Sequence, residues 1–308
     1  MWSRLLAISK YTSFRIIAIT LLLYTGGYCY FFVNDGFTLS GISSEYSYDP
    51  RYDTRKLALN EELLLGDILN QEYTYLGHGA QFYAFLSASG EHVIKFFRYK
   101  CLRHKPWLDY FDFIPIVDRY RLSKIKERRK KRELVFASCQ IAFDHLQEES
   151  GLVCVHLNKT RNRYPSITLT DKIGRKHRIE LDEMEFLVQK KAQLLGPHIE
   201  QLMALGNIDG AKKIISDLIA MMSSECNKGL ADDDVTILKN TGVVDGKPIH
   251  IDIGLFKHNE EFKQPETRGQ KLLSNTRKFN QWLKKQYPVL SEHLETELKH
   301  YTEKGVGC

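Results

Sequence analysis

Two short stretches decide the fold of this chain: Gly77-His78-Gly79-Ala80-Gln81-Phe82-Tyr83-Ala84-Phe85, which leads to Val93-Ile94-Lys95-Phe96-Phe97, and the distant Ile249-His250-Ile251-Asp252-Ile253-Gly254. The first predicts a strand, a glycine turn, a second strand and a third strand that carries one lysine. The second predicts a strand that ends in Asp-Ile-Gly, and Asn240 lies in the loop before it. More than a hundred residues separate the two stretches.

These residue types suit a site for a phosphorylated ligand. Glycines allow backbone amides to approach phosphate oxygens closely, and a lysine on a neighbouring strand neutralises phosphate charge. An asparagine and an aspartate supply the oxygen ligands that magnesium prefers. Each part has a simpler explanation, since a lone Gly-x-Gly is common in hairpin turns and a strand lysine often extends to water. The order of the parts along the chain is the informative feature.

Composition indicates a folded protein with a localised basic segment. The chain has 308 residues, of which 43% are hydrophobic, and a formal net charge of +6. The stretch from Arg119 to Arg132 holds nine basic residues and one glutamate, so the rest of the chain has a net charge of about −2. An acidic partner, nucleic acid or anionic lipid headgroups could bind this stretch, although nucleic acid is the least expected, and a solvated helix face is the alternative. Six scattered cysteines without CxxC spacing indicate no zinc site or disulfide framework.

The N-terminus contains a candidate membrane segment. Ile16 to Val33 has eighteen residues without a charge, and Arg4, Lys10 and Arg15 precede it. Because this length just reaches the thickness of a bilayer core, we expect a single-pass membrane anchor, with a cleaved signal peptide and a buried core helix as the alternatives. The positive-inside rule would place the globular body away from the cytoplasm, where ATP is not always supplied, so the side on which the body lies stays open.

Hydrophobic periodicity gives the remaining elements. We expect a membrane segment over 1–36, a linker over 37–60 and a globular domain over 61–308, divided near residue 190. Strands are predicted over 73–76, 81–87, 92–97, 153–157, 166–171 and 176–181, and helices over 122–146, 199–205, 211–226, 267–287 and 290–301.

From about residue 70 to 257 the order of motifs resembles the protein-kinase-like superfamily. The resemblance implies an α+β fold of two lobes: a small antiparallel-sheet N-lobe over 61–190 and a short, mostly helical C-lobe over 191–308, preceded here by the transmembrane helix. It implies ATP and magnesium as cofactors. Carried over to this sequence, it assigns the glycine loop and adenine contacts to Gly77, Gly79, Ala84 and Val188, phosphate binding to Lys95, and metal binding to Asn240 and Asp252. It also implies a carboxylate partner of Lys95 on a helix, which we assign to Glu133, with Glu127 and Glu148 as its rivals.

Three departures from the family pattern affect the expected activity. Phe82 replaces the usual third glycine, and no His-Arg-Asp triplet is present. Asp234, one residue out of register, is the expected catalytic aspartate, with Asp232 as its rival. Only about fifty residues follow Asp252. We therefore expect a membrane-anchored atypical kinase-like phosphotransferase that transfers the γ-phosphate of ATP to a hydroxyl acceptor. The alternatives are a pseudokinase that keeps the fold as a scaffold or binding module, and a membrane-tethered basic interaction protein without a nucleotide site.

Overall fold

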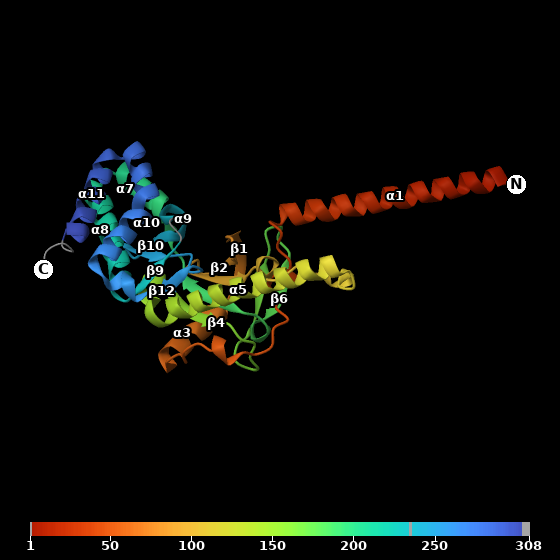
Figure 1. The fold of residues 1–308 in the computed structure, drawn as a ribbon, viewed down its shortest axis with the longest axis horizontal. Coiled ribbons are helices and arrows are strands. Elements are labelled where there is room, and N and C mark those ends of the chain that lie inside the picture. The colour runs from red at the N-terminus through yellow and green to blue at the C-terminus, as the bar shows by residue number, and fades with distance from the viewer. Residues whose placement is uncertain (1, 234–235, 304–308) are drawn as a thin grey trace.

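The structure is a computed structural model that describes residues 2–233 and 236–303. It is a mixed α+β fold in which helices gather at one end, strands lie in the middle and one long helix leaves at the opposite end (Figure 1). The strands that form the main sheet are β1 (Glu72–His78), β2 (Phe82–Ser87), β3 (His92–Phe97), β4 (Leu152–His156), β5 (Ser166–Thr170), β6 (Lys176–Glu180) and β7 (Phe186–Lys190).

The seven strands follow the order β4-β7-β3-β2-β1-β5-β6. Pairing is antiparallel except between β1 and β5. Tight turns join β1, β2 and β3, as the sequence predicts from its glycine and serine positions. Ala84, Lys95 and Leu187 lie side by side across β2, β3 and β7. This register places Lys95 near the centre of the sheet.

Both faces of the sheet are covered. The long helix α5 (Pro115–His145) packs on one face through Val135, Phe136, Cys139 and Phe143. The short helix α6 (Gln147–Ser150) leads from α5 into β4. On the other face, α3 (Leu59–Leu69) buries Leu65, Ile68 and Leu69 against strand residues such as Phe85 and Phe96. Each face therefore has its own apolar core.

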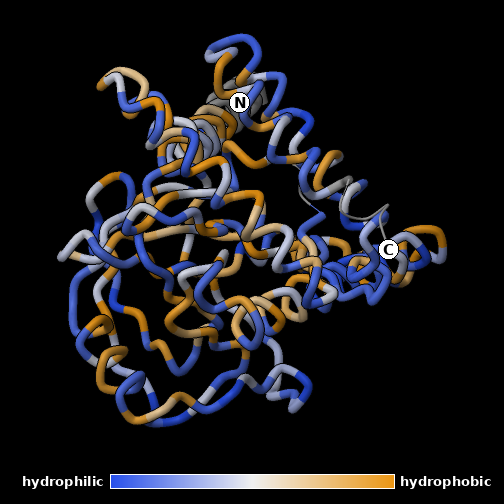
Figure 2. Tube along the Cα trace, turned by 90° about the vertical axis from the view of Figure 1, so that its left-hand side faces the viewer, coloured by the Kyte–Doolittle hydropathy of each residue, from blue (hydrophilic) through white to orange (hydrophobic). Residues whose placement is uncertain are grey.

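The second part of the body is mainly helical. Helix α8 (Ile208–Asn227) buries residues at helical spacing, including Ile214, Leu218 and Met222, and Asn207 caps its start by accepting a hydrogen bond from Gly210 N. The other elements here are β8 (Gln193–Leu194), α7 (Leu195–Ala204), β9 (Leu230–Asp232), α9 (Ile237–Asn240), β10 (Thr241–Val244), β11 (Lys247–His250), β12 (Phe256–His258), α10 (Pro265–Gln286) and α11 (Pro288–Glu303). Apolar residues such as Leu272, Phe279 and Leu294 form the core of this bundle, and Figure 2 shows hydrophobic and hydrophilic stretches alternating along the chain.

Helix α1 (Trp2–Val33) stands apart from the body (Figure 1). Its section Arg15–Val33 has a mean hydropathy of 1.8, is long and apolar enough to cross a membrane, and has none of its length buried within the structure. The expected continuous helix is therefore present.

The segment expected as a linker over 37–60 packs against the body instead. Phe37 and Ile42 are fully buried in the core beneath α3, and Tyr52 packs edge-on against Phe136 with ring centroids 4.9 Å apart. The segment also contains α2 (Leu39–Ile42) and a turn of 3₁₀ helix, Pro50–Tyr52. Polar residues between these widely spaced apolar ones concealed their role as packing anchors in the sequence.

Candidate functional site

Lys95 is enclosed at the junction of the sheet and the helical part. Its ammonium donates hydrogen bonds to Gln189 Oε1 at 2.6 Å and to the backbone carbonyl of Ile251. Burial lowers the pKa of Lys95 to about 8, although the nearby Asp252 carboxylate and Cys139 thiol act to raise it. The lysine and Asp252, 157 positions apart in the sequence, thus converge as the sequence predicts.

The buried side chain of Gln189 on β7 links three parts of the protein. Its Oε1 accepts from Lys95, while its Nε2 donates to the carbonyls of Ser150 on α6, at 2.5 Å, and His250 on β11, at 2.7 Å. Both polar atoms of the Gln189 amide are thereby hydrogen-bonded, in a region where an unsatisfied polar group is costly. Gln189 holds Lys95 in place from the sheet side.

Asn240 and Asp252 are brought together by the β10–β11 hairpin. The carbonyl of Asn240 accepts from Ile251 N at 2.7 Å and from Asp252 N at 3.4 Å. The Asp252 carboxylate accepts from Gly254 N at 3.2 Å. Ser138 on α5 fixes the following residues, since its hydroxyl donates to the Ile253 carbonyl and accepts from Phe256 N. The Asp-Ile-Gly segment is therefore held by both α5 and the hairpin.

The glycine turn lies over this segment. Gly77 is at an irregularity in the β1–β2 pairing, and Gly79 N donates to the Phe82 carbonyl at 2.9 Å. A Cβ at either glycine would meet open space, so the turn backbone is accessible from outside. Gln81 from the turn rests on Gly254, where a Cβ would collide with its amide. The two glycine-containing motifs are in direct contact.

Two residues that the sequence assigned to the site, Glu133 and Val188, have side chains that do not face Lys95 in the structure. Glu133 lies on α5 but forms ion pairs with Arg129 at 3.1 Å and Arg51 at 3.9 Å, so it is not the partner of Lys95. Among the residues of α5, Cys139 is the one close enough to Lys95 to affect its pKa. Spacing alone could not choose the helical turn that faces the lysine, because α5 has 31 residues and begins earlier than predicted.

Val188 is inside the sheet rather than at a connection between the two parts. Its backbone is in register with Ile94 on β3 and Cys154 on β4, and its side chain is buried in the core on the face away from Lys95. The strand runs to Lys190, and only then does the chain cross to β8. The side chain of Val188 therefore belongs to the core of the sheet and does not face Lys95.

The three consecutive aspartates have different environments. Asp234 lies outside the described residues. Asp232 is buried on β9, and its backbone carbonyl accepts from Asn275 Nδ2 at 3.1 Å. Asp233 pairs with Lys257 and with Lys271, the latter at 2.9 Å, and these two lysines together outweigh its partial burial and lower its pKa.

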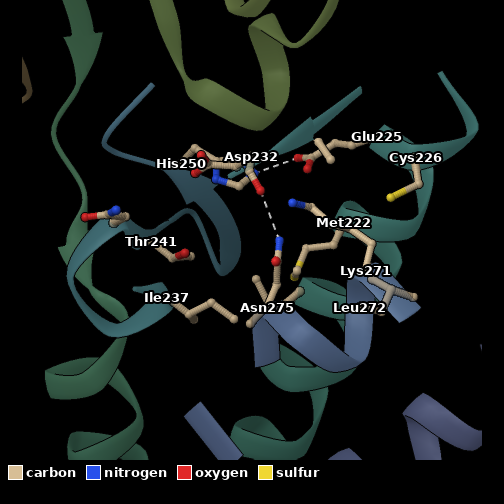
Figure 3. A pocket seen from close by; sticks show the side chains of 13 residues that line it. Met222, Glu225, Cys226, Asp232, Ile237, Thr241, His250, Lys271, Leu272 and Asn275 are labelled. Carbon is tan, nitrogen blue, oxygen red and sulfur yellow. Dashed lines mark hydrogen bonds and ion pairs between the residues drawn. The ribbon is translucent and has the colours of Figure 1, made fainter. Parts of the chain in front are cut away.

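A small cavity of about 20 Å³, lined by both apolar and polar side chains, lies between α8, β9, β11 and α10, and Asn240 is among its lining residues (Figure 3). His250 and Glu225 face each other across it, with His250 Nε2 2.6 Å from Glu225 Oε1. Burial alone would lower the pKa of His250, but the Glu225 carboxylate outweighs burial and holds that pKa above its ordinary value. Asn240 Nδ2 is buried without a hydrogen-bond partner among the described residues. A space of this size has room for one water molecule.

The residues at this site fit a magnesium nucleotide. Asp252 offers carboxylate oxygens and Lys95 offers a cation close to it, while the backbone carbonyl of Asn240 is bonded to the backbone of Asp252. Among the buried polar atoms that have no hydrogen-bond partner within the described residues, two lie at this site, Asn240 Nδ2 and Gln81 Oε1. Within residues 2–233 and 236–303, no group of three or more His, Cys, Asp and Glu side chains is placed to hold a metal ion. Magnesium commonly uses one or two protein carboxylates together with substrate phosphates.

The sequence did not single out Gln189, Ser138 or Gln81. Gln189 had a usable signal, because it is the one polar residue in the otherwise apolar Phe186–Gln189 run of a buried strand. Ser138 and Gln81 had none, since serine on a helix and glutamine in a turn are ordinary surface residues.

Comparisons with known proteins give limited information. No known protein family and no curated protein matches the chain. Solved structures of WbdD are similar to it: the high-resolution crystal structure (17% identity, 77% of this chain, TM-score 0.37), the complex with the kinase inhibitor LY294002 (16%, 74%, 0.35), and the structure described as a bifunctional kinase-methyltransferase (17%, 73%, 0.33). This chain spans between 42% and 45% of the length of those chains.

Proposed function

We propose that this protein is a membrane-anchored, atypical kinase-like phosphotransferase that uses ATP and magnesium. The observation that carries the proposal is the convergence of Lys95 on β3 with Asp252 and Asn240, which come from a hairpin far along the chain. A lysine that served only to stabilise the fold would need just a backbone carbonyl as hydrogen-bond acceptor, or access of its ammonium to water. Here the lysine is enclosed next to an aspartate and an asparagine, beneath a glycine turn, which is the set of groups that phosphoryl transfer requires.

The roles of the residues follow from their chemistry. Bound ATP with magnesium supplies the phosphoryl group and neutralises its developing charge. Lys95 would hold the phosphates, and Asn240 and Asp252 would hold the metal through their oxygens. Gly77 and Gly79 would direct backbone amides at the phosphates, with Ala84 above the adenine. The backbone that meets adenine would lie after Lys190, where the chain crosses between the two parts. Asp234 would orient the acceptor hydroxyl and accept its proton.

A thermal-shift titration with ATP and magnesium tests the nucleotide site. The detergent-solubilised full chain should be stabilised by the nucleotide, while Lys95→Ala and Asp252→Ala should lose this stabilisation. Lys176→Ala is the matched control, because Lys176 is exposed on β6 and pairs only with Glu72 at the surface. Stabilisation that survives in both site variants would refute a nucleotide site at this place.

The alternative function is a pseudokinase scaffold or binding module. It is favoured by the neutral partner of Lys95, since Gln189 stands where the kinase resemblance expects a carboxylate, and by the engagement of Asp233 with two lysines. The comparison of Asp234→Asn with the parent protein separates the two functions. Loss of phosphoryl transfer with retained ATP binding supports the enzyme. ATP binding without transfer to any hydroxyl compound by the parent protein supports the pseudokinase.

Membrane anchoring is proposed from α1. Its apolar section is fully exposed on the outside of the body, and large aromatic residues stand at its C-terminal end, as is typical of a membrane interface. The chain should resist extraction from membranes at alkaline pH. Release of the chain by that treatment would contradict a transmembrane helix.

A further inference from the structure

Between β3 and the body of α5 the protein exposes an unusual number of large apolar side chains. They lie on the 3₁₀ helix η2 (Pro106–Phe111) and on the start of α5, and we call residues 107–116 the aromatic tip. Exposed fractions reach 53% for Trp107, 78% for Tyr110, 75% for Phe113 and 82% for Ile116. Phe111 and Ile114 are exposed as well. A clustered apolar surface of this kind marks an interaction site more often than a scattered one does.

The aromatic tip is a built feature rather than a loose loop. Leu108 is buried and anchors it from below. Asp109 accepts from His104 Nε2 at 2.9 Å and from Arg121 at 3.2 Å, which joins the tip to α5. Arg121 also pairs with Asp118 at 2.8 Å. These contacts hold the apolar side chains outward in a defined arrangement.

The helix that follows the tip supplies positive charge. Arg119, Lys126 and Lys130 are exposed and form no ion pair with the residues that the structure describes. Two carboxylates near the tip, Asp109 and Asp118, are paired internally, and Asp112 is the exposed acid that lies between the aromatic residues. Apolar side chains next to unpaired cations match the interface of a bilayer with anionic lipids.

The position of the tip relative to α1 identifies the surface that it meets. In Figure 1 the N-terminal end of α5 projects from the body toward the same side as α1. Residues before the tip contact the end of α1 and the helix that follows it: the Lys100 ammonium lies 4.4 Å from the ring centroid of Phe31 on α1, and Arg103 donates to the carbonyl of Ser40 on α2 at 3.1 Å. The base of the tip is thus fixed where α1 joins the body.

We propose that the aromatic tip is a second membrane contact, which inserts into the interface of the same bilayer that α1 spans. Trp107, Tyr110, Phe113 and Ile116 enter the headgroup and acyl boundary, while Arg119, Lys126 and Lys130 bind anionic headgroups. This inference rests on the proposed membrane anchoring by α1. Two attachment points prevent the body from swinging about α1, so the site around Lys95 keeps one orientation relative to the membrane.

Quenching of Trp107 fluorescence by brominated lipids tests the proposal in the full chain reconstituted into liposomes that contain anionic lipid. Trp2 and Trp282 are replaced by phenylalanine, so that Trp107 is the only tryptophan. We expect a blue-shifted emission that brominated lipids quench and that aqueous acrylamide reaches poorly. Substitution of Arg119, Lys126 and Lys130 by alanine should reduce the quenching, and neutral liposomes should give the same reduction.

Control variants keep the result interpretable. Replacement of Tyr110, Phe113 and Ile116 by serine should remove the quenching of Trp107, while serine at Leu59, Leu205 and Leu273, which are exposed elsewhere on the body, should not. Trp107 that stays open to acrylamide and unaffected by brominated lipids overturns the proposal. The proposal is also overturned if Trp107 is shielded from acrylamide, is not quenched by brominated lipids, and becomes more shielded as the density of protein in the membrane rises. That result would indicate that the tip contacts a second copy of the chain.

Alkaline extraction of the same liposomes separates the two possible failures. If the chain is extracted, anchoring by α1 fails and the further inference fails with it. If the chain stays in the membrane while Trp107 remains unquenched, only the second contact is refuted.

Discussion

Replacement of Gln189 by leucine should destabilise the protein severely although leucine fits a buried strand. The structure shows three hydrogen bonds made by this one amide, to Lys95 Nζ and to the carbonyls of Ser150 and His250. Leucine has a similar size and satisfies none of these groups. The variant therefore tests whether the amide, rather than the volume, is what this position requires.

The expected loss follows from the types of bond. Each of the two carbonyls loses a neutral hydrogen bond worth about 1 kcal/mol, and the ammonium loses one worth about 1.5–3 kcal/mol. The total is about 4 kcal/mol, a large share of the roughly 5–15 kcal/mol that usually stabilises a domain. For a domain of this size we expect the melting temperature to fall by about 10 °C. Without its acceptor, the ammonium is less stabilised, so the pKa of Lys95 should fall further below its ordinary value.

Thermal unfolding of the detergent-solubilised chain, followed by circular dichroism, measures the effect. Gln193→Leu is the matched control, because Gln193 is exposed on β8 and its side chain forms exposed hydrogen bonds with His198 and Gln201. A surface change of this kind should alter the free energy of unfolding by no more than about 0.5 kcal/mol. Equal melting temperatures for the two variants would refute the linking role given to Gln189.

Three further predictions concern protons and chain boundaries. Binding of magnesium ATP should be accompanied by proton uptake near pH 8.5, because the phosphates raise the pKa of Lys95 from about 8. Calorimetry in buffers of different ionisation enthalpy should detect this uptake, and it should be absent in Lys95→Met. Glu225→Gln should destabilise the protein by about 3–5 kcal/mol at pH 6, since it leaves buried His250 without its carboxylate. Because the pKa of His250 is raised in the folded protein, the difference in free energy of unfolding between the parent and the variant should be fully present below about pH 6.5 and should shrink as the pH rises through the folded pKa. A difference in urea unfolding that does not depend on pH would contradict an ion pair between His250 and Glu225. A chain that begins at Asn34 should fold, whereas the free energy of unfolding of a chain that begins after Phe37 should be lower by about 3–5 kcal/mol, because the core loses Phe37. Urea unfolding of the two truncated chains measures this difference. Equal stabilities would contradict the role of Phe37 in the core.

Much of the fold could be predicted because it rests on local patterns. The strands β2 and β3 and the helices α8 and α10 lie within a few residues of the predicted bounds, since alternation and helical spacing of apolar residues determine them directly. The start of α5 was missed by seven residues because Pro115 to Arg121 buries little apolar surface. The packing of residues 37–60 was missed for the related reason that its apolar anchors are separated by polar ones.

The sequence predicts the positions of site residues that belong to a local backbone motif. It does not predict which side chains contact each other when they come from elements far apart in the sequence. Glycine turn, strand lysine and Asp-Ile-Gly each follow from local structure, and β-sheet register together with the β10–β11 hairpin brings them together. The partner of Lys95 depends on the rotation of α5 about its axis and on the reach of β7, neither of which is a local property. A helical glutamate and a strand glutamine are equally consistent with the sequence until both elements are packed.

The choice of glutamine over glutamate has a physical consequence for the proposed activity. A carboxylate at 2.6 Å would neutralise the Lys95 ammonium within the protein and keep its pKa high, whereas the Gln189 amide leaves the ammonium short of negative charge, and burial lowers its pKa to about 8. Asp252 supplies part of the missing charge, but magnesium at that carboxylate would withdraw it. Phosphate oxygens then become the groups that best stabilise the ammonium. In the proposed nucleotide complex the phosphates would supply the negative charge that the protein itself does not provide, so Gln189→Glu should weaken nucleotide binding even if it leaves the protein folded.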